Sequence, residues 1–207
     1  MEGALRSGAD APDLRLIETM LWDGEAVQRL GLHLARLSRG AAALGWPFDM
    51  AALRKAVSQL PDHPARLRIT LDRAGQVMAG VTPLPPAKAL WRLGLAPARL
   101  RSDDPWLRIK STNRAAYDAA RAALPAGLDE LIFQNERGEV CDGTITTLFF
   151  DRGAGLRTPP LSSGLLPGIL RESLNCPEEV LPAEDLPQVQ LWVGNALRGL
   201  IRAEWAG

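Results

Sequence analysis

The amino-acid sequence predicts a mixed α/β (α+β) fold divided into two lobes. Segments with strand-like and helix-like patterns alternate along the 207 residues without a regular βαβ period, which is typical of mixed folds. A proline-rich stretch, TPLPPAK (82–88), interrupts this alternation and has the composition of a linker. We therefore expect a smaller N-terminal α/β lobe over residues 1–83 and a larger C-terminal α/β lobe over residues 84–207.

The composition argues against several classes of protein. Hydrophobic residues make up 46% and charged residues 23% of the chain, and the formal net charge is zero, as in ordinary globular proteins. No basic cluster indicates a nucleic-acid or membrane partner, and no apolar run is long enough to span a bilayer. The first residues lack the apolar core of a signal peptide, so we expect a cytoplasmic protein that acts on a small molecule. Cys141 and Cys176 have no metal-binding spacing, so we expect no metal site.

The N-terminal lobe is expected to run strand, strand, helix, helix, strand, strand. Residues 13–27 have the pattern of two strands joined at Asp23-Gly24, a pair that is common in hairpin turns. Apolar residues then recur at helical spacing over 30–45, and Gly45 is suited to end that helix.

A second helix and a second hairpin complete this lobe. Asp49 can cap a helix over 49–60, because its short carboxylate can accept the exposed N–H groups of a first helical turn. In the segment that follows, apolar residues alternate with polar ones, which predicts a hairpin over 66–83.

The C-terminal lobe is expected to hold more strands than helices. Its predicted strands cover residues 89–97, 105–110, 129–134, 139–150 and 189–194. Its predicted helices cover 113–124 and 167–174, and Pro167 suits the first turn of the second helix.

One lysine has the surroundings of a reactive amine. Lys110 ends the run WLRIK (106–110), whose alternation would place Leu107 and Ile109 on one side of a strand and Lys110 on the other. Apolar neighbours remove hydration from an ammonium group, which lowers the pKa of a lysine and frees its amine to attack a carbonyl. The plainer interpretation is a surface lysine at the end of a strand.

Two further segments follow Lys110 along the chain. One has an aspartate at the start of an expected strand, and the other is a glycine-rich stretch before an expected helix. Asp142 precedes the β-branched run TITT (144–147), and a carboxylate there needs a partner such as a protonated pyridine nitrogen. In SSGLLPGILRES (162–173), small residues come directly before a helix whose first N–H groups could receive a phosphate. Each segment also has an ordinary interpretation, since Asp142-Gly143 is a common turn pair and the second segment is a well-punctuated helix start. Together with Lys110 they supply what a pyridoxal phosphate (PLP) site needs.

A further pair of residues could bind a phosphate. His33 and Arg36 are three residues apart on the helix expected over 30–45, so they are neighbours on its face. The planar guanidinium of Arg36 could hold a phosphate through two hydrogen bonds. The alternatives are a histidine that packs in the core and an arginine that is solvated.

The order and spacing of these segments make the chain resemble the fold-type IV PLP-dependent enzymes. These include branched-chain and D-amino acid aminotransferases and 4-amino-4-deoxychorismate lyase. The most specific similarity lies in DELIFQNERGEVCDGTITTLFF (129–150) and LSSGLLPGILRESL (161–174). The similarity extends over nearly the whole chain through LIETMLWDG (16–24), HLARL (33–37), RIKSTNRAAYDAAR (108–121) and VGNALRGL (193–200).

The resemblance implies a two-lobed fold like that of D-amino acid aminotransferase, with the cofactor between the lobes. Lys110, in the larger lobe, would carry the Schiff base to PLP. Arg36 and the backbone N–H groups of Ile169 and Leu170 would hold the phosphate. Asp142 would face the pyridine nitrogen, where the family has a glutamate with one more methylene group.

The same resemblance assigns candidate substrate-binding residues. Asn195 and Ala196 fall in the family's late segment near the substrate carboxylate. Arg108, close to Lys110 in the sequence, is a further candidate. With Arg99, Arg101 and Arg114 it could form a cationic clamp for an aromatic acid.

The resemblance implies a PLP-dependent lyase or aminotransferase that acts as a homodimer. The short chain and the NALRG ending favour 4-amino-4-deoxychorismate lyase, which releases pyruvate and gives 4-aminobenzoate. One alternative is a branched-chain or D-amino acid aminotransferase, which would need an apolar substrate pocket. A second alternative, left open by Asp142, is a degenerate relative that binds PLP without turnover.

Overall fold

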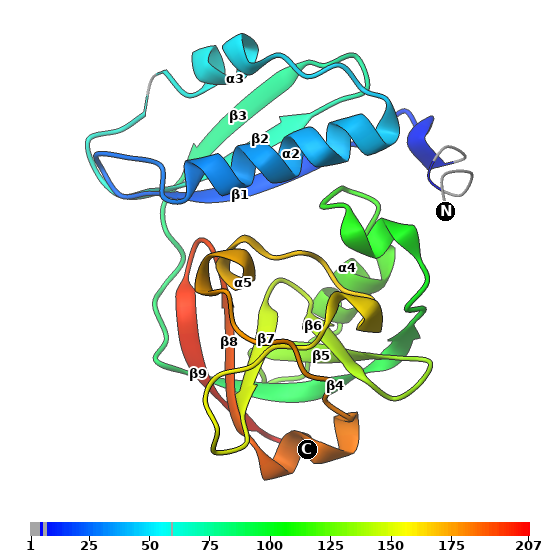
Figure 1. Ribbon diagram of the computed structural model, residues 1–207. Helices are drawn as coiled ribbons and strands as arrows, with labels where there is room; N and C mark the ends of the chain where they lie inside the picture. Colours follow the sequence, from blue (N-terminus) through cyan, green and yellow to red (C-terminus); the bar gives the residue numbers. More distant parts are fainter. Residues whose placement is uncertain (1–4, 6–7, 59) are drawn as a thin grey trace. The chain divides into compact units, whose positions relative to one another are not determined.

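The computed structural model describes residues 5, 8–58 and 60–207, and the chain forms two compact units (Figure 1). Unit 1 comprises Met1–Pro86 together with Ile109–Asn113, and unit 2 comprises Ala87–Arg108 and Arg114–Gly207. The first boundary lies three residues after the one expected at 83. The short segment 109–113, which includes Lys110, belongs to unit 1 although the sequence placed it in the C-terminal lobe.

Unit 1 is an antiparallel sheet covered by two helices. The sheet has the order β1-β2-β3, formed by β1 (Leu16–Trp22), β2 (Ala65–Leu71) and β3 (Val77–Thr82). Helix α2 (Leu30–Leu44) packs along β1 and helix α3 (Met50–Ala56) packs along β3 (Figure 1).

The expected alternation of β2 builds the core of unit 1. Leu67, Ile69 and Leu71 have no exposed surface, whereas Arg68 between them is exposed. Leu71 pairs with Leu16 of β1, whose side chain lies against α2. The period of two in the sequence therefore marks the side of the sheet that the helices cover.

Both helices begin much as the sequence predicts, but only α2 ends where it was expected. Gly45 ends α2 in the left-handed conformation, with φ of 68°, and its N–H donates to the carbonyls of the last turn. The side chain of Asp49 accepts the N–H of Ala51 at the start of α3. Helix α3 ends at Ala56, earlier than the expected residue 60, and residue 59 lies outside the described residues.

The hairpin expected over 13–27 is wrong in its second strand. Only Trp22 and Val27 form an isolated bridge after β1, and β1 instead pairs over its whole length with β2. The turn is held by Asp23, whose carboxylate accepts the N–H groups of Glu25 and Ala26. The chain then enters α2 directly, which leaves no room for a second strand.

The strand expected over 105–110 is also wrong. Pro105–Arg108 form a single 3-10 turn, because the carboxylate of Asp104 accepts the N–H of Trp106 and bends the chain. The residues that follow lie along the edge of β1. Ile17 donates its N–H to the carbonyl of Lys110 at 2.9 Å, and Leu16 forms a bridge with Ser111.

Unit 2 is built on a six-stranded sheet with the order β6-β5-β4-β9-β8-β7. The parallel pairs in it are those that β4 (Leu90–Leu100) makes with β5 (Glu130–Asn135) and β9 (Gly199–Trp205). The other pairs of neighbouring strands are antiparallel and involve β6 (Val140–Gly143), β7 (Thr147–Asp151) and β8 (Gln190–Asn195). Strand β9 is absent from the sequence-based expectation.

The predicted strand over 139–150 is divided into two. Strands β6 and β7 stand at opposite ends of the strand order, yet only residues 144–146 separate them. The sheet therefore curves until its two edges approach each other, and the N–H of Gly143 donates to the carbonyl of Thr146 at 2.8 Å. The interior holds fully buried apolar side chains from several strands, among them Leu93, Ile132, Leu148, Phe150 and Val193.

Short helices complete unit 2. Helix α4 (Ala115–Ala122) lies within the range expected for it, and α5 (Ile169–Leu174) begins two residues after Pro167. The N-cap of α5 is Gly168, so Pro167 precedes the helix and is not in its first turn. Two 3-10 segments, Leu161–Ser163 and Ala183–Gln188, connect the remaining strands and helices. None of the described helices combines the length and the apolar character needed to cross a lipid bilayer.

Gly31 within α2 and Gly45 directly after it offer a matched test of where this helix ends. Among the described residues, a Cβ at Gly31 or at Gly45 would meet no atom within 4 Å apart from its chain neighbours and the nearby backbone of its own helix, so only the backbone responds. Gly45→Ala should lower the free energy of unfolding by about 1 kcal/mol, because alanine disfavours a positive φ. Gly31→Ala, inside the helix, should raise it by about 0.5 kcal/mol. Denaturant unfolding of both variants measures this, and changes of the same sign would contradict the assignment.

Candidate functional site

A buried polar cluster joins α2 to β1 within unit 1. The Arg36 guanidinium donates through Nε to Glu18 Oε1 at 2.8 Å and through Nη2 to Glu18 Oε2 at 2.6 Å. His33 Nδ1 lies 2.6 Å from the same Oε2 atom. All three residues are buried, so α2 turns a polar patch of its inner face toward a strand carboxylate.

The electrostatics of this cluster favour a charged Glu18. Burial alone would raise the pKa of Glu18, but the hydrogen bonds and charges of Arg36 and His33 outweigh burial and hold the pKa below its usual value. The bidentate pair fixes the plane of the Arg36 guanidinium. His33 Nε2 is buried and has no hydrogen-bond partner among the described residues, which is uncommon for a buried polar atom.

Lys110 belongs to the same unit as this cluster. Its side chain is half-buried, and its carbonyl accepts the N–H of Ile17, the residue before Glu18. The neighbouring Ile109 is buried, and a Cβ at Gly40 of α2 would lie 3.9 Å from its Cγ2 atom. The short 109–113 segment thus lies along the edge of β1, on the strand that carries Glu18.

In unit 2, Asp142 is a buried carboxylate with a donor on each oxygen. The Tyr117 hydroxyl donates to Oδ1 at 3.1 Å, and the N–H of Leu166 donates to Oδ2 at 3.2 Å. Glu139, which directly precedes the strand that holds Asp142, instead accepts from Arg137, Asn135 and Ser163. The hydrogen bond from Arg137 is the largest influence that lowers the pKa of Glu139, to about 2.

The loop after Asp142 is organised by Glu130, which the sequence analysis did not identify. This carboxylate has no exposed surface and accepts the N–H groups of Thr144 and Ile145 at 3.1 and 3.2 Å. It also accepts the hydroxyl groups of Thr144 and Thr146. A signal was present in the sequence, because a glutamate at the start of an apolar strand must find buried partners.

The glycine-rich segment before α5 packs closely against β7. A Cβ at Gly168 would lie 2.5 Å from Thr147 Oγ1, so only glycine allows this approach. Ile169 and Leu170, which begin α5, are buried. The N–H groups of a first helical turn have no carbonyl of their own helix to bind, so they can receive an anionic group.

Of the predicted substrate residues, Asn195 ends β8 and Ala196 begins the turn that leads to β9. Asn195 Nδ2 donates to the carbonyl of Ile145, and its Oδ1 accepts the N–H groups of Leu197 and Arg198. Ala196 is buried. Asn195 therefore holds its own turn and connects it to the loop that Glu130 organises.

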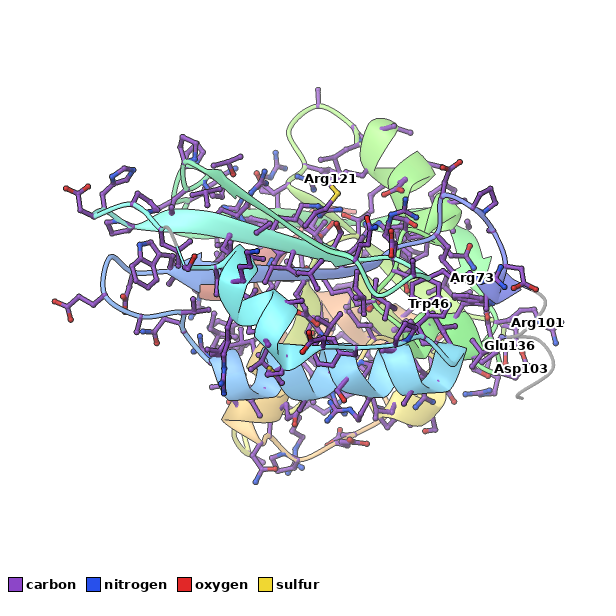
Figure 2. The ribbon with its side chains drawn as sticks, turned by 90° about the horizontal axis from the view of Figure 1, so that it is seen from above. Trp46, Arg73, Arg101, Asp103, Arg121 and Glu136 are labelled. Atoms are coloured by element: carbon purple, nitrogen blue, oxygen red, sulfur yellow. The ribbon has the colours of Figure 1, made fainter. Side chains whose placement is uncertain are left out.

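The four arginines considered as a cationic clamp all have local partners. Arg108 is exposed and donates to the carbonyl of Leu161. Arg99 donates to the carbonyl of Asn135, and Arg114 donates to that of Thr144. Arg101 forms an ion pair with Asp103 near Glu136, and the three are labelled together in Figure 2.

Taken by itself, each unit holds groups of chemical types that PLP can bind. Unit 1 holds an amine, Lys110, and a fixed guanidinium, Arg36. Unit 2 holds a buried carboxylate, Asp142, and the first N–H groups of α5. An amine, a carboxylate and phosphate-binding donors are the chemistry that this cofactor requires. Within the described residues, no group of three or more His, Cys, Asp or Glu side chains is placed to hold a metal ion.

Comparison with known proteins identifies a family. Residues 15–204 match the family described as amino-transferase class IV. A protein of Schizosaccharomyces pombe (strain 972) with the name "Putative aminodeoxychorismate lyase" is 33% identical over 167 residues, covering 77% of this chain and 72% of its own.

Two solved structures extend the comparison. A "Putative amino-acid aminotransferase" from Mesorhizobium loti has 41% identity and a TM-score of 0.87, covering 94% of this chain and 100% of its own. The PLP-bound form of a "hypothetical aminotransferase" from Mycobacterium tuberculosis has 23% identity and a TM-score of 0.79, covering 93% and 81%. The second likeness concerns the fold alone.

The buried ion pair of unit 1 predicts a large effect on stability. Arg36→Ala should cost about 3–5 kcal/mol of unfolding free energy, because it leaves the buried Glu18 carboxylate uncompensated. Adding Glu18→Gln should recover part of that loss, since the charge is then removed as well. Denaturant unfolding of the two variants checks this, and a double variant no more stable than Arg36→Ala would contradict it.

Proposed function

We propose that this chain, which belongs to the class IV amino-transferase family, binds PLP through Lys110 and acts on an amino substrate. The observation that carries the proposal is the buried Asp142 carboxylate, held through both oxygens beside the glycine-rich segment that leads into α5. PLP, when bound, draws electrons from the bonds of the carbon that bears the substrate amine.

Residues of both the cofactor-binding and the proton-transfer kind can be named. Asp142 would hold the pyridine nitrogen protonated, because a buried carboxylate favours a charged partner. Arg36 and the backbone N–H groups of Ile169 and Leu170 would bind the phosphate. The Lys110 amine, once displaced by the substrate amine, would carry a proton to or from the reacting carbon. We also propose that the enzyme acts as a homodimer, as the family resemblance implies.

For the specific reaction we propose 4-amino-4-deoxychorismate lyase activity, with release of pyruvate and formation of 4-aminobenzoate. The support is the relative from Schizosaccharomyces pombe, at 33% identity. The Mesorhizobium loti structure, at 41% identity, favours a second candidate, an amino-acid aminotransferase. A cationic clamp that includes Arg108 would favour the lyase, whose product is an aromatic acid; each of the four arginines also has a partner within unit 2.

One pair of assays separates the candidate reactions. The PLP-loaded protein is given 4-amino-4-deoxychorismate, and pyruvate and 4-aminobenzoate are measured. In parallel it is given a panel of amino acids with 2-oxoglutarate, and glutamate is measured. Pyruvate without glutamate supports the lyase and the reverse supports the aminotransferase. PLP binding with neither product would support the degenerate relative.

The lysine assignment has a direct chemical test. The sequence contains three lysines, Lys55, Lys88 and Lys110. Borohydride reduction of the PLP-loaded protein, followed by peptide mapping, should place the stable adduct on Lys110. Lys110→Ala should abolish both the adduct and the visible absorption band of the bound cofactor. An adduct on Lys55 or Lys88 would refute the assignment.

If Asp142 holds the pyridine nitrogen protonated, the charge of its side chain should matter more for turnover than the shape of that side chain. Asp142→Asn should leave PLP bound but lower turnover by about 100-fold or more, because an amide cannot hold the pyridine nitrogen as a cation. Asp142→Glu should keep or improve turnover, since it keeps the charge and lengthens the side chain. Steady-state kinetics of both variants measure this, and full activity of Asp142→Asn would show that Asp142 is only structural.

A further inference from the structure

We infer that Tyr117 is a positioning residue that fixes the Asp142 carboxylate in the orientation its cofactor contact requires. This inference rests on the proposed function, because it assigns Tyr117 a role through Asp142. Tyr117 is the only tyrosine of the chain and was given no role by the sequence analysis.

The geometry holds the carboxylate from two directions. Tyr117 on α4 donates to Oδ1 at 3.1 Å, while Leu166, in the segment before α5, donates its N–H to Oδ2 at 3.2 Å. An aspartate side chain has two torsions, and a donor on each oxygen restrains both of them. The hydrogen bonds come from two separate segments of unit 2, so the orientation of Asp142 depends on the fold of that unit.

Tyr117 is itself held in place. Its ring packs edge-on against Phe133, with ring centroids 4.9 Å apart and an interplanar angle of 63°. The Arg114 guanidinium lies 5.5 Å from the centre of the same ring. Arg114 is in turn tied to Asp118 at 2.7 Å and to the carbonyl of Thr144 at 2.8 Å. The tyrosine is therefore a preorganised donor.

The direction of the hydrogen bond is fixed as well. Burial, followed by the charge and the hydrogen bond of Asp142, raises the pKa of Tyr117 well above its usual value. The phenol therefore keeps its proton at any pH at which the enzyme would work. A phenol that stays protonated donates to the carboxylate and stabilises its ionised form.

Tyr117→Phe removes the hydroxyl and keeps the ring against Phe133. Thr158→Val is the matched control, because Thr158 is a fully buried residue of unit 2 whose hydroxyl donates to the carbonyl of Leu148 at 2.9 Å. Both variants lose one hydroxyl group that donates a hydrogen bond within unit 2, and Thr158 is the more deeply buried of the two, so Thr158→Val should lose at least as much stability. Only Tyr117→Phe removes a donor from Asp142.

Two measurements test the inference. In the protein without cofactor, carbon-13 NMR follows the carboxyl titration of Asp142, with Asp142→Asn identifying the signal. The midpoint should move about one pH unit upward in Tyr117→Phe, because a donor to the charged form is lost. In the PLP-loaded protein, kcat should fall by about tenfold with little change in KM, because the electron-withdrawing ring is then less well held. Thr158→Val should show neither effect.

The outcomes separate this inference from the proposed function. If the parent protein gives no PLP absorption band, both fail. If the parent binds PLP and turns over, but Tyr117→Phe keeps its kcat and its titration midpoint, Tyr117 only packs and the inference alone fails. A shifted midpoint with unchanged kcat would also overturn it, because the hydrogen bond would then have no influence on positioning.

Discussion

The fold of unit 2 depends on one buried carboxylate, that of Glu130. Strands β6 and β7 stand at opposite ends of the sheet order, and three residues must join them. Such a tight loop directs N–H and hydroxyl groups inward, and buried donors are costly without acceptors. Glu130 accepts these groups from Thr144, Ile145 and Thr146, so the loop and the strand before it keep one conformation. Asp142 lies just before that loop, and Tyr117 and Leu166 donate to its two carboxylate oxygens.

Unit 1 also contains a buried strand glutamate that organises the residues around it. Glu18 of β1 is also a buried carboxylate, and it orders α2 through Arg36 and His33. In both units a strand glutamate therefore sets the position of residues to which we assign a role toward the cofactor. This arrangement makes those residues rigid before any ligand arrives, which reduces the entropy lost on binding. It also couples stability to function, so that substitutions at Arg36 or Glu130 affect both.

The candidate site could be predicted from sequence only in part. The order of Lys110, Asp142 and the glycine-rich segment was readable, because each has a residue type with distinct chemistry. The hydrogen-bond partners around the site could not be predicted, because they are distant in the sequence. Tyr117 lies 25 residues from Asp142, and Glu130 lies 16 residues from Thr146. The grouping of the arginines near Lys110 into one clamp stays a prediction. Proximity in sequence suggested a shared clamp, whereas each guanidinium donates to a different group within unit 2.

The sequence by itself determined the family, the mixed α/β class and the elements with a strong local signal. Helix α2, the cap at Asp49 and the β2–β3 hairpin follow from short-range periodicity and capping, which need no distant partner. The other features of the fold depend on contacts between segments that are distant in the sequence. The run over 105–110 alternates like a strand, but it divides between a 3-10 turn and a segment paired to β1, because the Asp104 side chain bends the chain and β1 offers a free edge. Strand β9 and the division of 139–150 likewise arise from pairing between distant segments, which no local pattern encodes.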